Sequence, residues 1–395
     1  MRLLFFIIAM GLSITACNPE VSQRQSPAFD ELLSVEIENA MESTSAVAMA
    51  IAVIRDGQVT HVSAHGIRDT SDNPLETETI MYAASITKAA FAYMVLQLVD
   101  EGLVDLDTPI SEYLPEPLPS YTGEEIEDLY SSWSDLEGDD RWGNLTLRIL
   151  LTHSPGFANF AFLEPDRRLR FHFEPGEQYS YSGVGFILAQ FVLEYGLELD
   201  VRQEMQMRVF DHLGMPNSDM MWRDDFAENN AYGWDQTGQA YYHDDRSKTR
   251  AAGSLDSTIA DIAQLAAGLV RGEGLSEPAR EEFTGRHLPI TVRTQFPTLQ
   301  DELPADEQIE GFFAGLGVVV FDGPQGPGFM KGGHNEMTGN TMVCLIETQD
   351  CVVILANDVR AEAAFPALVE YVLGETGAPW SWEYGNMEFW QRNSQ

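Results

Sequence analysis

The chain has 395 residues, 44% of them hydrophobic, so it can bury a large core and is not intrinsically disordered. Its 62 acidic residues against 23 basic ones give a net charge of −39, which repels nucleic acids and anionic lipid surfaces. We therefore exclude a nucleic-acid partner and expect a small-molecule substrate or ligand.

The first segment, residues 1–17, has the pattern of an export signal. It reads MRLLFFIIAMGLSITAC, with one arginine, an apolar run too short to span a bilayer comfortably, and small residues before a cysteine. Residues 14–17 resemble a bacterial lipobox, which implies that the signal is removed and that Cys17 becomes an acylated first residue. This predicts a lipoprotein on the periplasmic face of the cell envelope, with residues 18–27 as a tether. Ordinary soluble export, with Cys17 incidental, is the alternative.

A helix and a hairpin are predicted next. Ser26 and Pro27 suit the N-cap and first position of a helix, and apolar residues follow at helical spacing. Val47–Ile54 and Val59–Gly66 are apolar, β-rich runs around an Asp-Gly turn signal, which predicts a hairpin.

The stretch Met81–Gly102 combines a predicted buried helix with a candidate catalytic pair. Its apolar residues recur at helical spacing, and Gly102 is suited to end the helix. Ser85 and Lys88 stand three residues apart, so their side chains can share a helix face and hydrogen-bond. A desolvated lysine can lose its proton near neutral pH and activate a serine as a nucleophile.

Lysine is rare in this chain, which adds weight to Lys88. It occurs only at positions 88, 248 and 331, whereas arginine occurs 20 times and supplies nearly all the solvated positive charge. Because lysine can lose its proton and arginine cannot, Lys88 suits proton transfer better than solvation. A helix-surface cation is the alternative interpretation.

Residues 107–250 show almost no strand pattern. We expect them to form a mostly helical subdomain inserted into an α/β part made of residues 28–106 and 251–378. Leu114–Asp140 is rich in Pro, Ser, Glu and Asp, which predicts an acidic surface segment. Further on, a Pro-Gly turn leads to Tyr181, for which local sequence alone favours packing over proton transfer. His153 is expected to be a structural hydrogen-bonding residue.

The C-terminal part returns to strand patterns. The predicted strands are Gly315–Phe321, Thr341–Ile346 and Cys351–Ala356, and Ala361–Leu373 is a predicted closing helix. Helices and strands at both ends indicate an α/β sheet with helices on its faces.

Two features near the C-terminus keep alternatives open. Cys344 and Cys351 flank a predicted hairpin turn, where a cross-strand disulfide and two separate buried thiols are both compatible with the sequence. The aromatic tail, residues 379–395, is expected to pack against the body, with contact to a membrane or partner as the alternative.

Four stretches occur in the order found in the serine β-lactamase and penicillin-binding-protein-like hydrolases. They are Ser85-Ile86-Thr87-Lys88, Leu-Leu-Thr-His-Ser-Pro-Gly-Phe at 150–157, Tyr181-Ser182-Gly183 and Lys331-Gly332-Gly333. The chain resembles this family from about Val47 to about Asn357, and within it the class C and family VIII esterase branch. The resemblance implies an antiparallel sheet flanked by helices. It also implies that Ser85 is the acylated nucleophile, Lys88 its base, and Tyr181 a proton carrier to the leaving group.

The resemblance also assigns substrate-binding residues. Lys331 would lie on a strand edging the site, where its charge would keep Tyr181 in its active state and attract a substrate carboxylate. The backbone N–H groups of Ser85 and of His334, just after Gly333, would form an oxyanion hole.

Two glycines depart from the family pattern. Gly183 stands where the family has an asparagine that orients the substrate, and Gly332 stands where it has a hydroxyl that helps bind the β-lactam carboxylate. Both departures favour esters, small amides or peptides over β-lactams as substrates.

We therefore expect a serine hydrolase that acts through a covalent acyl-enzyme on ester, or small amide or peptide, bonds. A β-lactamase or D-Ala-D-Ala carboxypeptidase would differ only in substrate, and a catalytically silent binding or sensor module is an alternative of another class. The eight histidines show no metal-ligand spacing, so we predict no metal and no other cofactor.

Overall fold

The computed structural model describes residues 27–385. The predicted export signal, the acylated Cys17, nearly all of the tether 18–27 and the end of the aromatic tail lie outside the described residues. None of the described helices is long and apolar enough to cross a bilayer.

An eight-stranded antiparallel sheet forms the centre of the fold, in the order β2-β1-β12-β11-β10-β9-β8-β7. Its strands are β1 (Ala48–Arg55), β2 (Gln58–Gly66), β7 (Leu288–Pro289), β8 (Phe312–Ala314), β9 (Val319–Gly323), β10 (Gly326–His334), β11 (Gly339–Leu345) and β12 (Asp350–Ala356). Two short pairs stand apart from it: β3 (Met81–Tyr82) with β6 (Asp256–Ser257), and β4 (Gly233–Trp234) with β5 (Ala240–Tyr241). Strand β1 pairs with β12, so the two ends of the described chain meet in one sheet.

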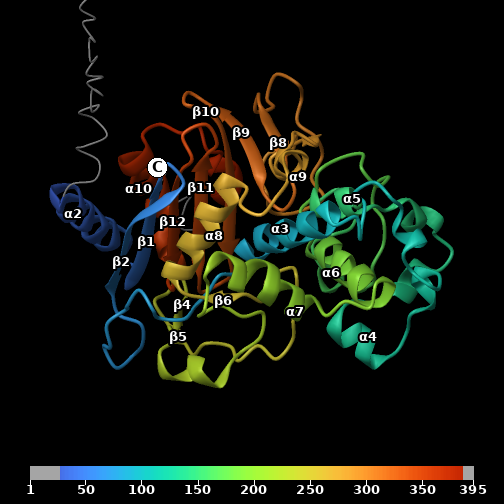
Figure 1. Ribbon diagram of the computed structural model, residues 1–395, viewed down its shortest axis with the longest axis horizontal. Coiled ribbons are helices and arrows are strands. Elements are labelled where there is room, and N and C mark those ends of the chain that lie inside the picture. The colour runs from blue at the N-terminus through green and yellow to red at the C-terminus, as the bar shows by residue number, and fades with distance from the viewer. Residues whose placement is uncertain (1–26, 386–395) are drawn as a thin grey trace, which may run out of the picture.

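Ten α-helices accompany the sheet in the described part of the chain. They are α2 (Pro27–Thr44), α3 (Ile86–Asp100), α4 (Glu124–Leu129), α5 (Leu147–Leu151), α6 (Gly183–Phe191), α7 (Val201–Met205), α8 (Ile259–Arg271), α9 (Glu277–Phe283), α10 (Phe365–Leu373) and α11 (Trp380–Tyr384). In Figure 1, α8 and α3 lie on one face of the sheet, while α2 and α10 lie at its other side.

The sheet is buried on both faces, and β1 shows this best. All eight of its residues are buried. Ala50 and Ala52 belong to the core shared with α3 and α8, whereas Ile51 and Val53 belong to the core shared with α10 and α11. A strand covered on both faces needs apolar residues at every position, which explains why the sequence of β1 is a continuous apolar run.

Several predictions from local sequence are confirmed. The Asp-Gly turn joins β1 to β2, with Asp56 and Gly57 both at positive φ. The pattern Thr258-x-x-Asp261 resembles the entry to a capped helix. Helix α8 begins there, with the Thr258 hydroxyl accepting a hydrogen bond from the Asp261 N–H at 3.1 Å, and it ends at Gly272 in the left-handed conformation.

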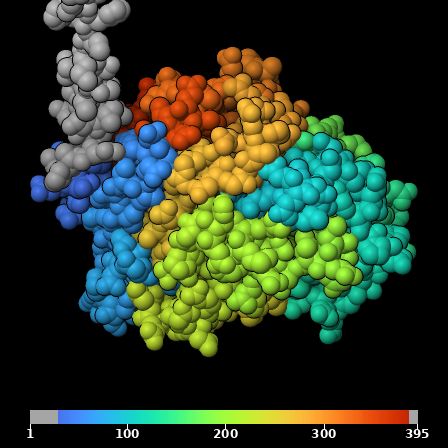
Figure 2. Space-filling model, viewed as in Figure 1, coloured from blue at the N-terminus to red at the C-terminus, as the bar shows by residue number. Residues whose placement is uncertain are grey.

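Residues 107–250 contain α4 to α7, several short 3-10 and π turns, and the β4–β5 hairpin. In the space-filling view, the cyan and green atoms of this region form the side of the molecule away from the terminal strands (Figure 2). Leu114–Asp140 differs from the prediction of a surface segment, because Leu118, Trp133 and Leu136 are buried in the main core. The buried Trp133 side chain holds this acidic segment against the core. The limits of the insertion remain a prediction.

The C-terminal region has more strands than the sequence predicted. Strand β10 was not predicted from its residue pattern, because its glycines interrupt the apolar pattern, but the family resemblance placed Lys331 on a strand and β10 confirms this. The predicted strand at Gly315–Phe321 begins only at Val319, after a turn in which Gly317 has φ +72°. Cys344 and Cys351 stand opposite each other on β11 and β12 and form a disulfide. The part of the aromatic tail that the structure describes packs against the body, with Trp382 and Tyr384 buried.

Candidate active site

Ser85 lies at the N-cap of α3, at the junction of the sheet and the helical region. The residue before it, Ala84, has φ +48°, a conformation that costs an ordinary residue about 1–2 kcal/mol. Such strain is typical of functional positions. Here it turns the chain sharply from β3 into α3 and presents the Ser85 side chain at the helix end.

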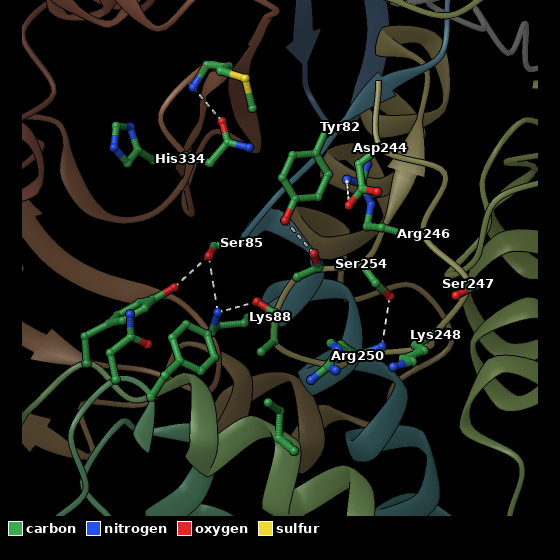
Figure 3. A pocket seen from close by; sticks show the side chains of 18 of the residues that line it. Tyr82, Ser85, Lys88, Asp244, Arg246, Ser247, Lys248, Arg250, Ser254 and His334 are labelled. Carbon is green, nitrogen blue, oxygen red and sulfur yellow. Dashed lines mark hydrogen bonds and ion pairs between the residues drawn. The ribbon is translucent and has the colours of Figure 1, made fainter. Parts of the chain in front are cut away.

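The three predicted catalytic side chains meet at this point (Figure 3). The Ser85 Oγ lies 3.2 Å from the Lys88 Nζ and 2.7 Å from the Tyr181 hydroxyl. The Lys88 ammonium also donates to the backbone carbonyl of Ala252, in the loop before α8. One hydroxyl is therefore held between an amine and a phenol that come from distant parts of the chain.

The environment of Lys88 favours its neutral form. Burial lowers the pKa of Lys88 well below the usual range of a lysine, and the positive charge of Lys331 lowers it further. Its side chain is 1% exposed, and it makes no ion pair with any residue of the described chain. A neutral amine beside a serine hydroxyl can accept the proton of that hydroxyl.

Tyr181 is held by His153. The two rings stack with their centroids 4.2 Å apart, and the His153 Nδ1 accepts the backbone N–H of Ser182 at 3.0 Å. Burial, together with Lys88 and Lys331, lowers the pKa of His153 well below its usual value, so this ring is neutral. His153 thus has the structural role that the sequence predicted.

Burial raises the pKa of Tyr181, and its hydrogen bond to Ser85 offsets the rise only in part. The Lys88 and Lys331 Nζ atoms lie 4.9 Å and 5.2 Å from the centroid of the Tyr181 ring. These neighbouring cations nevertheless do not stabilise Tyr181 as a tyrosinate. Tyr181 is therefore a phenol at neutral pH. It can pass a proton on, but it does not stand ready as a base.

A pocket of about 610 Å³ opens above these groups. Apolar side chains of Phe160, Ile187 and Phe296 line part of it, together with Ser85, Lys88 and Tyr181. In Figure 3, His334 lies on one side of Ser85 and the basic side chains of the loop 244–250 lie on the other.

Two of the three basic side chains of that loop are paired with carboxylates, whereas Arg250 donates to the backbone oxygen of Asp128. Arg246 pairs with the buried Asp256, and Lys248 pairs with Asp128 at 2.5 Å.

Within residues 27–385, no group of three or more His, Cys, Asp or Glu side chains is placed to hold a metal ion. The predicted absence of a metal stays a prediction.

The predicted substrate-binding residues lie on β10, which passes close to α3. A side chain on Gly333 would place its Cβ 2.5 Å from the backbone oxygen of Ala83, so only glycine allows this approach. His334 lines the pocket, and its Nδ1 lies 2.7 Å from the Glu362 Oε1. Burial opposes protonation of His334, but Glu362 outweighs it and raises the pKa of His334. Lys331 lies beside Tyr181 and is not among the residues that line the pocket.

Two acidic residues close to the site were not among the predicted site residues. Glu362 is fully buried in the 3-10 turn Val359–Ala364 that precedes α10, and Glu383 is buried in α11. Burial raises the pKa of both carboxyl groups. For Glu383, the sequence did contain a signal, because this residue stands among the aromatic residues of Trp380–Tyr384. An acidic residue in such an apolar segment seldom serves only to make the surface soluble.

Comparison with known proteins decides the family. A family model described as Beta-lactamase matches residues 35–373. The chain belongs to the Beta-lactamase family. It is therefore a hydrolase of the serine type, which agrees with the hydroxyl, amine and phenol that meet at Ser85.

Three individual proteins show distant similarity to the chain. The chain is 23% identical over 338 residues to the probable fimbrial assembly protein FimD, serogroup H1, of Dichelobacter nodosus, covering 77% of this chain and 78% of that protein. It is 24% identical over 182 residues to esterase EstB of Burkholderia gladioli, covering 43% and 46%. The structure of D-alanine carboxypeptidase AmpC from Burkholderia cenocepacia superimposes with a TM-score of 0.66 at 16% identity, over 87% of this chain and 98% of that one.

Proposed function

We propose that the chain hydrolyses neutral ester bonds through an acyl-enzyme on Ser85. In the first step, the neutral Lys88 amine takes the Ser85 hydroxyl proton while the Oγ attacks the substrate carbonyl carbon. Tyr181 then donates its phenol proton to the leaving oxygen as the bond to that oxygen breaks, and it regains a proton from the Lys88 ammonium. Water then attacks the acyl carbon, and Lys88 and Tyr181 take up a proton of that water and pass it to the Ser85 Oγ as the bond between Oγ and the acyl carbon breaks, which releases the acid.

The single observation that carries this proposal is the position of the Ser85 Oγ between the Lys88 Nζ and the Tyr181 hydroxyl. The lowered pKa of Lys88 supports its assignment as the base, and the raised pKa of Tyr181 supports its assignment as the proton donor. The backbone N–H groups of Ser85 and His334 remain the predicted oxyanion hole.

Three observations support esters over β-lactams. The apolar side chains of Phe160, Ile187 and Phe296 suit an uncharged acyl group. Gly332 has no side chain with which to bind a substrate carboxylate. The partly matching relative from Burkholderia gladioli is described as an esterase. The similarity to a D-alanine carboxypeptidase structure keeps β-lactams and D-alanyl peptides as the comparison substrates.

The test is hydrolysis of p-nitrophenyl butyrate by the mature chain, beside labelling with a fluorophosphonate probe. We expect turnover and a covalent adduct on Ser85, both lost in Ser85→Ala. Ser247→Ala is the matched control, because Ser247 lines the same pocket but is not bonded to Lys88 or Tyr181. Cephalosporin hydrolysis that is clearly faster than ester hydrolysis would contradict the ester preference, and no turnover of any of these substrates would favour a silent binding module.

We also propose that the chain is a lipoprotein of the bacterial envelope, acylated at Cys17 and facing the periplasm. The lipobox-like sequence supports this. Expression in a bacterial host is expected to place the chain in the membrane fraction, and Cys17→Ser is expected to abolish its labelling by a palmitate analogue. Unchanged labelling of Cys17→Ser would refute acylation at this residue.

A further inference from the structure

Lys331 is the positive charge that a negatively charged substrate would be expected to meet. It is 5% exposed, and its Nζ lies 5.2 Å from the centroid of the Tyr181 ring. A carboxylate on the leaving group would lie on this side of Ser85, because Tyr181 supplies the proton to the leaving group in the proposed reaction. The position beside Lys331 therefore decides whether the site accepts an anionic leaving group.

A carboxylate of the chain itself, that of Glu383, lines the same small cavity as Lys331. Helix α11 places Glu383 against β10, where a Cβ on Gly332 would lie 1.9 Å from the Glu383 Oε1. The Gln295 Nε2 donates to the other oxygen, Oε2, at 2.7 Å. Glu383 is 6% exposed, so its carboxyl group is held in place and shielded from solvent. Gly332 is required here because any side chain would collide with the carboxyl group.

The charges of Glu383 and Lys331 each shift the pKa of the other residue. Burial lowers the pKa of Lys331, and Glu383 opposes this shift. In return, Lys331 opposes the rise that burial causes in the pKa of Glu383. The charge of Lys331 is thus partly balanced from within the protein.

Very little space remains beside this pair. Lys331, Gly332 and Glu383 line a side cavity of about 10 Å³, which is at most the room that one water molecule needs. The main pocket of about 610 Å³ contains Ser85 in its lining but not Lys331 or Glu383. A substrate carboxylate in the main pocket therefore makes no contact with Lys331 in this arrangement.

We propose that Glu383 is a specificity-determining residue that takes the place of a leaving-group carboxylate and so restricts the enzyme to uncharged leaving groups. The inference rests on the proposed hydrolase function and deepens it. Two effects act in the same direction: the Glu383 side chain fills the space, and its negative charge repels a second carboxylate. This also accounts for the buried acidic residue among the aromatic side chains of α11.

The experiment compares three esters that share an acetyl group. Phenyl acetate is uncharged, 3-acetoxybenzoate carries a carboxylate on the leaving group, and methyl 3-acetoxybenzoate matches its size without the charge. The parent chain is compared with Glu383→Ala, which removes bulk and charge, and with Glu383→Gln, which removes charge and keeps the hydrogen bond to Gln295. Glu370→Gln, at an exposed position on α10, is the control for the loss of one distant negative charge.

We expect the parent to hydrolyse both neutral esters and to disfavour the carboxylated one. In Glu383→Ala, the ratio of kcat/KM for 3-acetoxybenzoate to that for its methyl ester should rise about tenfold or more, mainly through KM. Glu383→Gln should give a smaller rise, and Glu370→Gln should give none.

An unchanged ratio in both Glu383 variants, with hydrolysis of phenyl acetate retained, would overturn the inference but leave the hydrolase function intact. Failure of the parent to hydrolyse phenyl acetate would instead count against the proposed function. If Glu383→Ala does not fold, Glu383→Gln decides alone, because it keeps the volume and the hydrogen bond of the native side chain.

Discussion

At the residue scale, the chemistry depends on whether Lys88 can lose its proton. Lys88→Arg keeps a positive charge next to Ser85 but removes the base, so kcat/KM for an ester should fall by about 10³ or more. Circular dichroism should show that the variant is folded. Activity close to that of the parent would mean that Lys88 serves only as a fixed charge.

The pH profile of the parent tests the same residue. Lys88 must be neutral to accept a proton, so activity should rise with pH through the pKa of Lys88 and then level off. Because burial and Lys331 lower that pKa well below 10.5, the acid limb of the profile should lie well below pH 10.5. An acid limb close to pH 10 would contradict this assignment.

Tyr181 is the second residue whose role can be isolated. Tyr181→Phe keeps the ring that stacks on His153 and removes only the hydroxyl bonded to Ser85. We expect kcat to fall by about 10² to 10³, while Tm changes little. Equal losses of activity and of Tm would indicate that the hydroxyl is mainly structural.

At the scale of elements, the approach of the β9 turn to α3 positions the base. Gly317 has φ +72°, and a Cβ there would lie 2.5 Å from the Lys88 backbone oxygen. Gly317→Ala should lower the free energy of unfolding by about 2–4 kcal/mol, since it combines backbone strain with overpacking. Gly102→Ala is the matched control, because φ is +71° and nothing lies within 4 Å, so only about 1 kcal/mol should be lost. Urea unfolding measures both, and equal losses would mean that the close approach to α3 does not matter.

Helix α11 is attached to the sheet mainly through Trp382. Its side chain is 1% exposed, with ring centroids 5.6 Å from Tyr179 and 5.0 Å from Phe312. Trp382→Ala should cost about 3–5 kcal/mol of unfolding free energy. The neighbouring Trp380 is only half-buried, so Trp380→Ala should cost clearly less. Similar costs in urea unfolding would show that α11 does not depend on the Trp382 contacts.

At the scale of the whole molecule, the net charge of −39 must be tolerated by a compact fold. Self-repulsion of this kind is screened by salt over a Debye length of about 10 Å at 0.1 M. Thermal unfolding should therefore shift to higher temperature by several degrees as NaCl is raised from about 0.02 M to about 0.5 M. A falling Tm would mean that the many arginine–carboxylate pairs on the surface outweigh the repulsion, because salt weakens those pairs as well.

The patterns that predicted structure correctly were short in range. The Asp-Gly turn between β1 and β2, the cap of α8 at Thr258 and the Ser85–Lys88 spacing each depend on neighbours within a few residues. Only the family resemblance placed Lys331 on a strand. The residue pattern of β10 did not predict one, because its glycines are explained only by the residues that face them, Ala83 and Glu383.

The amino-acid sequence by itself determined the family, the helix that carries Ser85 and Lys88, and the β1–β2 and β11–β12 hairpins, since motif spacing and hydrophobic periodicity are local properties. Only the tertiary structure decided that Tyr181 meets Ser85, that Cys344 and Cys351 are bonded, and that Glu383 lies over Gly332. Most of these contacts join segments separated by tens to hundreds of residues. Their chemistry depends on burial and on the neighbouring charges, and neither can be read from residue types alone.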